Sequence, residues 1–322
     1  MSSNSVAGLL PSMFDQTHIA PETQAFNAKL EQLIAGIPTI LELPAHVLRE
    51  ARAAGKSFLG PVVLSPNGEE RSIDGPAGRI SLRVFATTNA KGVLLHLHGG
   101  GFAFGAHDQQ DAMLDAIAAT TGLAVVSVGY RLTPEHPYPA ANDDCEAVAL
   151  WLANNALREF GSDRCFIGGE SAGAHLAVTT MLRLRDRHGL WPFRAAYLSY
   201  GAYDLSLTPS ARNWGTRNLV LSTPILSKYV EWFGAGDKLS DPDVSPLHAS
   251  LNALPPALFS VGTLDPLLDD TLFMSSRWIA AGNTAELCVY PGGVHGFNAL
   301  PGPLAGPANA RIVSFLKRHL AA

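Results

Sequence analysis

The 322-residue sequence has few cysteines, and they lie far apart. Cys145, Cys165 and Cys288 are odd in number and too widely spaced for a disulfide framework or a zinc-binding motif. We therefore expect three thiols that pack in the core of a protein from a reducing compartment, the cytoplasm.

The sequence also lacks a long apolar segment and an excess of one charge. Its apolar runs are of strand length, well short of the roughly 18 residues that cross a bilayer. The formal net charge is −5, which gives no electrostatic reason to expect nucleic acid or an anionic membrane as a partner. The first five residues carry no basic side chain, so the pattern does not favour a signal peptide.

The hydrophobic content of 47% and the charged content of 16% indicate a globular chain. From about residue 61 onward, apolar strand-like runs alternate with helical patterns. This alternation predicts an α/β fold, a mostly parallel sheet covered by helices on both faces. The expected strands are 80–85, 93–97, 123–128, 164–168, 195–199, 256–261 and 285–290. The expected helices are about 139–157, 172–187, 270–282 and 307–320.

Two regions do not follow this alternation. Residues 1–55 are predicted to be helical, and the apolar side chains that share one helical face there are Phe26, Leu30, Leu33 and Ile34. Residues 203–235 are polar with interspersed aromatic side chains. An insertion at the carboxyl edge of an open α/β sheet lies over the ligand crevice. We therefore expect an α/β domain over residues 56–322 that carries an insertion at about 203–235.

A serine lies at a predicted strand-to-helix turn, in Gly169-Glu170-Ser171-Ala172-Gly173. In a nucleophile elbow this serine has a strained backbone. The flanking glycines are then a steric requirement, because a side chain there would collide with the neighbouring strand or helix. The pattern alone is common, so its value depends on a general base, an acid and oxyanion donors elsewhere in the chain.

The candidate donors follow the expected strand 93–97, in His98-Gly99-Gly100-Gly101-Phe102. Three glycines allow the backbone to curl so that consecutive N–H groups face one point. A flexible turn and a phosphate-binding loop are the alternatives, but no Gly-Lys-Ser/Thr follows and no G-x-G-x-x-G leads into a helix. We expect the N–H groups of Gly100, Gly101 and Ala172 to form an oxyanion hole.

The candidate acid is Asp265, directly after the strand 256–261, where loops carry function. Asp269 and Asp270 are its rivals, and we expect one of them to cap the next helix instead.

His295 is the candidate base, because it is the histidine that combines a loop after a strand with flanking glycines. His319 is expected to face solvent or to interact with the end of its helix. His188 and His248 are expected to have no partner. The order Ser171, Asp265, His295 is the order of the catalytic triad in α/β-hydrolases.

Taken together, these motifs resemble the hormone-sensitive-lipase-like esterases, also called bacterial family IV carboxylesterases. The resemblance covers about residues 60–320. It rests on the five segments His98–Phe102, Tyr130–Glu135 with Pro139–Ala141, Gly169–Gly173, Asp265–Leu267 and His295–Phe297. It implies an α/β-hydrolase fold with a central, mostly parallel eight-stranded sheet. It also implies a helical cap built from residues 1–55 and about 203–235.

The resemblance implies a serine carboxylesterase that hydrolyses short- to medium-chain acyl esters through an acyl-enzyme, with Ser171 as nucleophile, His295 as base and Asp265 as its orienting acid. Such an esterase needs no metal or organic cofactor, and members of the family are often homodimers. An amidase or arylformamidase with the same triad is the alternative. A non-catalytic ligand-binding module is a further one, although such modules typically lack a triad member.

Several side chains near these motifs have two interpretations. Glu170 stands where the family usually has Asp or Thr, and we expect it to form hydrogen bonds under the elbow. Glu135 is expected to pair with Arg131 or to support the elbow. Phe102 and Trp214 are candidate substrate contacts, with packing within the cap as the alternative for Trp214.

Overall fold

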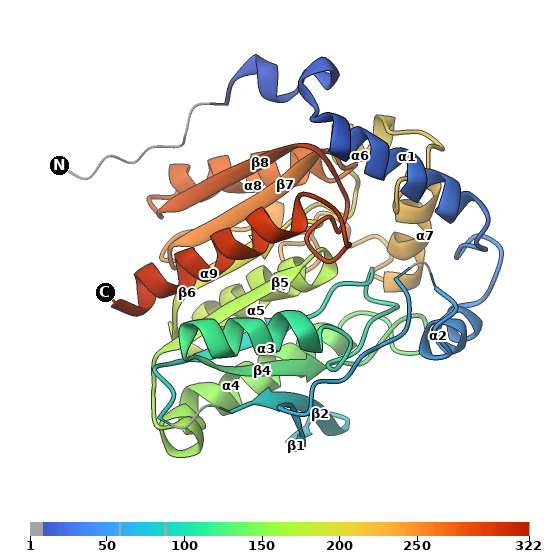
Figure 1. Ribbon diagram of the computed structural model, residues 1–322. Coiled ribbons are helices and arrows are strands. Elements are labelled where there is room, and N and C mark those ends of the chain that lie inside the picture. The colour runs from blue at the N-terminus through green and yellow to red at the C-terminus, as the bar shows by residue number, and fades with distance from the viewer. Residues whose placement is uncertain (1–8, 58, 87–88, 322) are drawn as a thin grey trace.

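The computed structural model describes residues 9–57, 59–86 and 89–321 (Figure 1). Within these ranges the strands form one eight-stranded sheet in the order β1-β2-β4-β3-β5-β6-β7-β8. The strands are β1 (Glu69–Gly75), β2 (Gly78–Phe85), β3 (Val93–Leu97), β4 (Ala124–Gly129), β5 (Cys165–Glu170), β6 (Phe193–Ser199), β7 (Ala257–Leu264) and β8 (Ala285–Val294). The helices are α1 (Pro21–Ala35), α2 (Ala45–Ala53), α3 (Asp111–Thr121), α4 (Ala140–Phe160), α5 (Ala172–His188), α6 (Pro209–Asn213), α7 (Thr223–Phe233), α8 (Leu268–Ala280) and α9 (Ala305–Ala321). The first five residues, on which the signal-peptide expectation rests, lie outside these ranges.

The sheet is parallel from β4 to β8, whereas β1 pairs with β2 and β2 with β4 in antiparallel orientation. Every residue of β3 and β5 is buried, as expected for parallel strands that are covered on both faces. Helices α3 and α9 pack on one face of the sheet, and α4, α5 and α8 on the other. The predicted mostly parallel α/β sheet is confirmed.

Two elements were not predicted. β1 is polar, its residues are exposed or half-buried, and it forms a hairpin with β2 at the edge of the sheet, so it has no buried face that leaves an apolar signature. The second is α3, which lies between β3 and β4 in the sequence and packs one side against the sheet. β8 also continues to Val294, beyond the predicted residue 290, so that His295 directly follows it.

The buried side of α1 differs from the prediction. Leu30 and Ile34 are buried, but Leu33 is 52% exposed, so its assignment to the packed face is wrong. The buried stripe consists of Thr23, Asn27, Leu30 and Ile34. Leu33 lies about 100° around the helix from Ile34 and therefore points away from this stripe.

The cysteines lie mostly as expected. Cys145 and Cys165 are buried, whereas Cys288 is half-buried on the edge strand β8. No helix among the described residues is both long enough and apolar enough to cross a membrane.

Helices α1, α2, α6 and α7 lie together at one end of the sheet, on the right of Figure 1. The strands β5, β7 and β8 finish at this end, and so does β3, because it pairs with β5 in parallel orientation. The loops that follow these strands therefore lie between the sheet and the four helices.

Candidate active site

Ser171 lies between β5 and α5 with φ 56° and ψ −120°, a backbone conformation that residues other than glycine rarely adopt. Gly169 and Gly173 flank it. A Cβ atom on either glycine would lie well inside 3.0 Å of the carbonyl oxygen of Leu97 on β3. The close approach of strand and helix thus supplies the steric reason that was expected for glycine at both positions.

Three side chains from three strand ends form one chain of hydrogen bonds. His295 Nε2 lies 2.8 Å from Ser171 Oγ, and His295 Nδ1 lies 2.9 Å from Asp265 Oδ2. Asp265 is 1% exposed and His295 is 6% exposed. A carboxylate only accepts hydrogen bonds, so Nδ1 carries the proton in this arrangement and Nε2 is free to accept the serine proton.

Neighbouring groups fix the acid and the histidine ring. The N–H of Leu267 donates to Asp265 Oδ1 at 2.9 Å. The ring of Tyr200 lies against His295 with 4.9 Å between centroids, and its hydroxyl donates to Asn298 Oδ1. Burial raises the pKa of Tyr200, so its hydroxyl remains a hydrogen-bond donor. Sequence reasoning missed Tyr200 and Asn298, because neither stands in a motif that marks it.

The triple-glycine segment forms a tight loop after β3. Gly100 has φ 123° and Gly101 has φ 60°, so both require the freedom of glycine. The carbonyl oxygen of Gly100 accepts hydrogen bonds from the N–H groups of Ala103 and Phe104. Among the described residues, the N–H groups of Gly100, Gly101 and Ala172 have no acceptor. Three backbone donors at this loop and at the start of α5 are therefore available for a ligand.

The side chain of His98 packs against this loop and contacts its backbone. Its ring stacks on Tyr130 with 4.1 Å between centroids, and its Nδ1 lies 2.9 Å from the carbonyl oxygen of Gly99. Tyr130 also donates to the carbonyl oxygen of His98 at 2.7 Å. Burial lowers the pKa of His98 to about 3, so the ring is neutral near pH 7 and supports the loop without a charge.

Glu170 is 2% exposed and lies under the elbow, where it accepts hydrogen bonds as predicted. Its carboxylate contacts His96 Nε2, Gln110 Nε2 and the Tyr197 hydroxyl, each at 3.1 Å. His96 also lies 2.9 Å from the hydroxyl of Ser127. Glu170 thus connects β3, β6 and the start of α3 beneath the serine.

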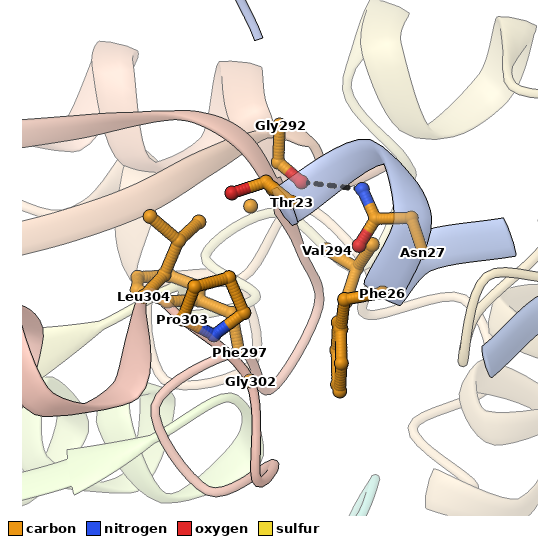
Figure 2. Close-up of a pocket in the computed structure, with 10 residues that line it drawn as sticks. Thr23, Phe26, Asn27, Gly292, Val294, Phe297, Gly302, Pro303 and Leu304 are labelled. Carbon is orange, nitrogen blue, oxygen red and sulfur yellow. Dashed lines mark hydrogen bonds between the residues drawn. The ribbon is translucent and has the colours of Figure 1, made fainter. Parts of the chain in front are cut away.

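A small pocket is lined by α1 and by residues 292–297, a segment called here the histidine loop (Figure 2). Asn27 of α1 is 6% exposed and donates to the carbonyl oxygen of Gly292 at 2.8 Å. Gly292 has φ 74°, and a Cβ there would lie within 3.0 Å of Ile19 and Thr23. The N-terminal helix therefore packs directly on the end of β8, three residues before His295. No local sequence signal marked Asn27.

The two rival acids do not cap α8, whose N-cap residue Leu267 makes no side-chain cap. Asp269 instead accepts a hydrogen bond from the N–H of Ser210 at 2.8 Å. Asp270 accepts from the N–H groups of Tyr203 and Asp204 at 2.6 and 2.9 Å. The expected capping role is therefore wrong, because these carboxylates hold the segment after β6. Burial raises the pKa of Asp270 to about 7.

Two histidines that were expected to lack partners have acidic neighbours. His188 Nε2 lies 2.7 Å from Glu146 Oε1, and His248 Nε2 lies 3.6 Å from Asp204 Oδ1. The chain brings these carboxylates close only on folding, so the local sequence did not show them. His319 is half-buried on α9.

Glu135 also has a different partner from the one expected. It pairs with Arg49 of α2, whereas Arg131 pairs with Asp144 at 2.9 Å. The expected pairing with Arg131 is therefore wrong, because Arg131 is bound by Asp144 of α4 and Glu135 by Arg49 of α2.

The two candidate substrate contacts differ in exposure. Phe102 is 3% exposed, and its ring lies 4.5 Å from that of Phe233 and 5.1 Å from that of His175, centroid to centroid. Trp214 is half-buried, and its Nε1 donates to the carbonyl oxygen of Arg217 at 2.7 Å.

Residues 94–299 match the family model for the α/β-hydrolase fold. This chain belongs to the α/β-hydrolase family. It is 35% identical to carboxylesterase NlhH of Mycobacterium tuberculosis over 238 residues, which cover 71% of this chain and 74% of NlhH. It is 30% identical to an acetyl esterase of Salmonella schwarzengrund over 230 residues, 69% of this chain and 70% of that one.

Solved structures agree with this assignment. The hyperthermophilic esterase from the archaeon Pyrobaculum calidifontis matches with a TM-score of 0.84 and 28% identity, over 94% of this chain and 99% of that chain. The predicted α/β-hydrolase fold and the predicted place among the hormone-sensitive-lipase-like esterases are confirmed. The α/β-hydrolase described here is an enzyme of the carboxylic ester hydrolase class.

Proposed function

We propose that this α/β-hydrolase is a serine carboxylesterase that acts on short- to medium-chain acyl esters through an acyl-enzyme. One observation carries the proposal: Ser171, His295 and Asp265 form a continuous hydrogen-bonded chain beside three backbone N–H groups that lack acceptors. A serine is a weak nucleophile unless a base takes its proton, and the tetrahedral intermediate needs donors for its oxyanion. The site offers both.

In the proposed reaction Ser171 Oγ attacks the ester carbonyl carbon while His295 Nε2 takes the serine proton. The carbonyl oxygen becomes an oxyanion and binds the N–H groups of Gly100, Gly101 and Ala172. Asp265 stabilises the imidazolium. His295 then gives the proton to the leaving alkoxide, which departs as the alcohol. Water repeats the sequence on the acyl-enzyme and releases the carboxylic acid. Such proton transfer contributes roughly 10²–10⁴ in rate.

We also propose that residues 1–55 and about 203–235 form a cap over this site on a catalytic domain of residues 56–322. The ring of Tyr229, on α7, covers Gly101 so closely that a Cβ there would lie well inside 3.0 Å of it. A covered site favours compact acyl groups, and one relative is named an acetyl esterase. Phe102 and Trp214 remain candidate walls of the acyl pocket. Catalysis without a cofactor, a cytoplasmic location and a homodimer also remain predictions.

Hydrolysis of p-nitrophenyl acetate and butyrate by the purified enzyme tests the proposal. Ser171→Ala should lose nearly all of the activity, by roughly 10³-fold or more. A fluorophosphonate should label Ser171 of the native enzyme, as mass spectrometry of its peptides would show. Retained activity in Ser171→Ala, or a label on another residue, contradicts the mechanism. Faster turnover of anilides or N-formyl arylamines than of esters would favour the amidase alternative.

A further inference from the structure

Arg49 is a cap residue that reaches a catalytic loop. It lies on α2 with its side chain 25% exposed. Its Nη1 donates to the carbonyl oxygen of Ala103 at 2.9 Å and to that of Thr133 at 3.2 Å. Its Nη2 donates to Glu135. One guanidinium group therefore binds two main-chain oxygens, and the first belongs to the oxyanion loop (residues 98–105).

The hydrogen bond to Ala103 is the first of two steps that lead to Gly101. In a planar trans peptide the C=O and the following N–H point in opposite directions. The peptide unit whose oxygen binds Arg49 therefore directs the N–H of Phe104 away from the arginine. That N–H donates to the carbonyl oxygen of Gly100 at 2.9 Å. The same rule then directs the N–H of Gly101 away from Phe104, on the side where it has no acceptor among the described residues.

The hydrogen-bonded chain thus begins at the guanidinium group of Arg49 and runs through the Ala103–Phe104 peptide to the Gly100–Gly101 peptide. It ends at the N–H of Gly101, which has no acceptor among the described residues. Dipoles that follow one another in a hydrogen-bonded chain polarise each other. A cation at the start of this chain strengthens the donor at its far end. Thr133 connects Arg49 to the oxyanion loop a second time. Its N–H donates to the carbonyl oxygen of Phe102 at 2.9 Å, and its own carbonyl oxygen accepts from Arg49.

We propose that Arg49 is a positioning residue of the oxyanion hole, which orients and polarises the N–H of Gly101 through these two peptide units. This inference rests on the proposed esterase function. It gives α2 a part in catalysis that goes beyond covering the site. The substrate is not required to touch Arg49, so its loss should lower the rate of acyl transfer more than the binding of the ester.

Arg49→Met keeps the length of the side chain and removes the charge and the donors. We expect kcat for p-nitrophenyl butyrate to fall by roughly 10- to 10²-fold with KM changed by less than about threefold, because a displaced oxyanion donor loses part of the 10²–10³ that one donor supplies. The affinity for an alkyl trifluoromethyl ketone, which forms an oxyanion adduct with the serine, should fall by the same factor.

Arg212→Met is the matched control. Arg212 donates to the carbonyl oxygens of Ser206 and Leu207 at 3.2 and 3.0 Å, so it makes the same kind of contact within the 203–235 segment. Its kcat and its inhibitor affinity should match those of the native enzyme. Active sites are titrated to completion with a fluorophosphonate, and kcat is expressed per labelled site, so that misfolded protein does not contribute.

Arg49→Lys separates charge from geometry. A single ammonium group keeps the cation but cannot form the same fork, so we expect kcat between those of the native enzyme and Arg49→Met. Three results would overturn the inference: native kcat per site in Arg49→Met, equal losses in Arg49→Met and Arg212→Met, or a loss of kcat without a loss of inhibitor affinity. An inactive native enzyme, or an active Ser171→Ala variant, would instead contradict the proposed function.

Discussion

The oxyanion loop (residues 98–105) follows β3, whereas the histidine loop (residues 292–297) includes the last three residues of β8; both segments are rich in glycine. In the histidine loop the proposed reacting group is the side chain of His295, which Asp265 holds directly at 2.9 Å. In the oxyanion loop the proposed reacting groups are backbone N–H groups, which have no side chain to hold them. Contacts to other peptide units, such as the one from Arg49 to Ala103, set their direction.

This difference shows how the same residue type serves two purposes. Gly296 has φ 75° and open space around its Cα, so glycine there provides only a backbone conformation. Gly101 has φ 60° and also lies under the ring of Tyr229, so glycine there provides both conformation and space. A substitution should therefore affect the two loops to different degrees.

The largest expected effect comes from Gly101→Ala. The added methyl group collides with the ring of Tyr229, and the loop must move to accommodate it. We expect kcat/KM for p-nitrophenyl butyrate to fall by roughly 10²–10³-fold, the cost of one lost oxyanion donor. Gly296→Ala, which meets no atom, should lose only about 1–2 kcal/mol of stability. Equal activity in the two variants would remove the distinction between the loops.

A smaller effect is expected from Asn27→Ala on the side of the histidine loop. The variant leaves the buried carbonyl oxygen of Gly292 without its donor, which should lower the free energy of unfolding by about 1–3 kcal/mol. His295 keeps its bond to Asp265, so kcat should change by less than about threefold. Urea unfolding and steady-state kinetics measure the two quantities.

Gln24→Ala is the control for that comparison, because its amide donates to the oxygen of Ile19 at 2.9 Å within the same N-terminal region. It should lose less stability than Asn27→Ala. A large fall in kcat in Asn27→Ala without loss of stability would show that the histidine loop, like the oxyanion loop, is positioned from the cap.

The smallest expected effect concerns pH and His98. The pKa of His98 is about 3 in the folded enzyme, against an ordinary value of about 6.5. Between these values the unfolded chain binds the proton and the folded one does not, so stability falls as the pH is lowered. His98→Gln should reduce the loss of unfolding free energy between pH 7 and pH 5.5 by about 1 kcal/mol.

Burial also lowers the pKa of His175, to about 4, and this group remains in the His98→Gln variant. The dependence on pH should therefore flatten rather than disappear. An unchanged dependence in urea unfolding at the two pH values would mean that His98 is not held neutral beneath the oxyanion loop.

The central sheet was predictable from its apolar strands, and the proposed triad from the position of each of its residues next to a strand end. Ser171, Asp265 and His295 each follow a predicted strand and lie within two residues of a glycine or proline, which predicts that they meet at one edge of a parallel sheet. The polar edge strand β1 left no such pattern. The roles of Asp269 and Asp270 depend on Ser210 and on the backbone after β6, about 60 residues away.

The sequence by itself determined the alternation of strands and helices, the elbow and the glycine loops, since apolar periodicity and the conformational freedom of glycine are local properties. Tertiary structure alone decided what surrounds these loops. Asn27 on Gly292 and Arg49 on Ala103 are contacts between segments 265 and 54 residues apart. No local pattern marks such partners, because a backbone carbonyl accepts from any donor that folding brings near it.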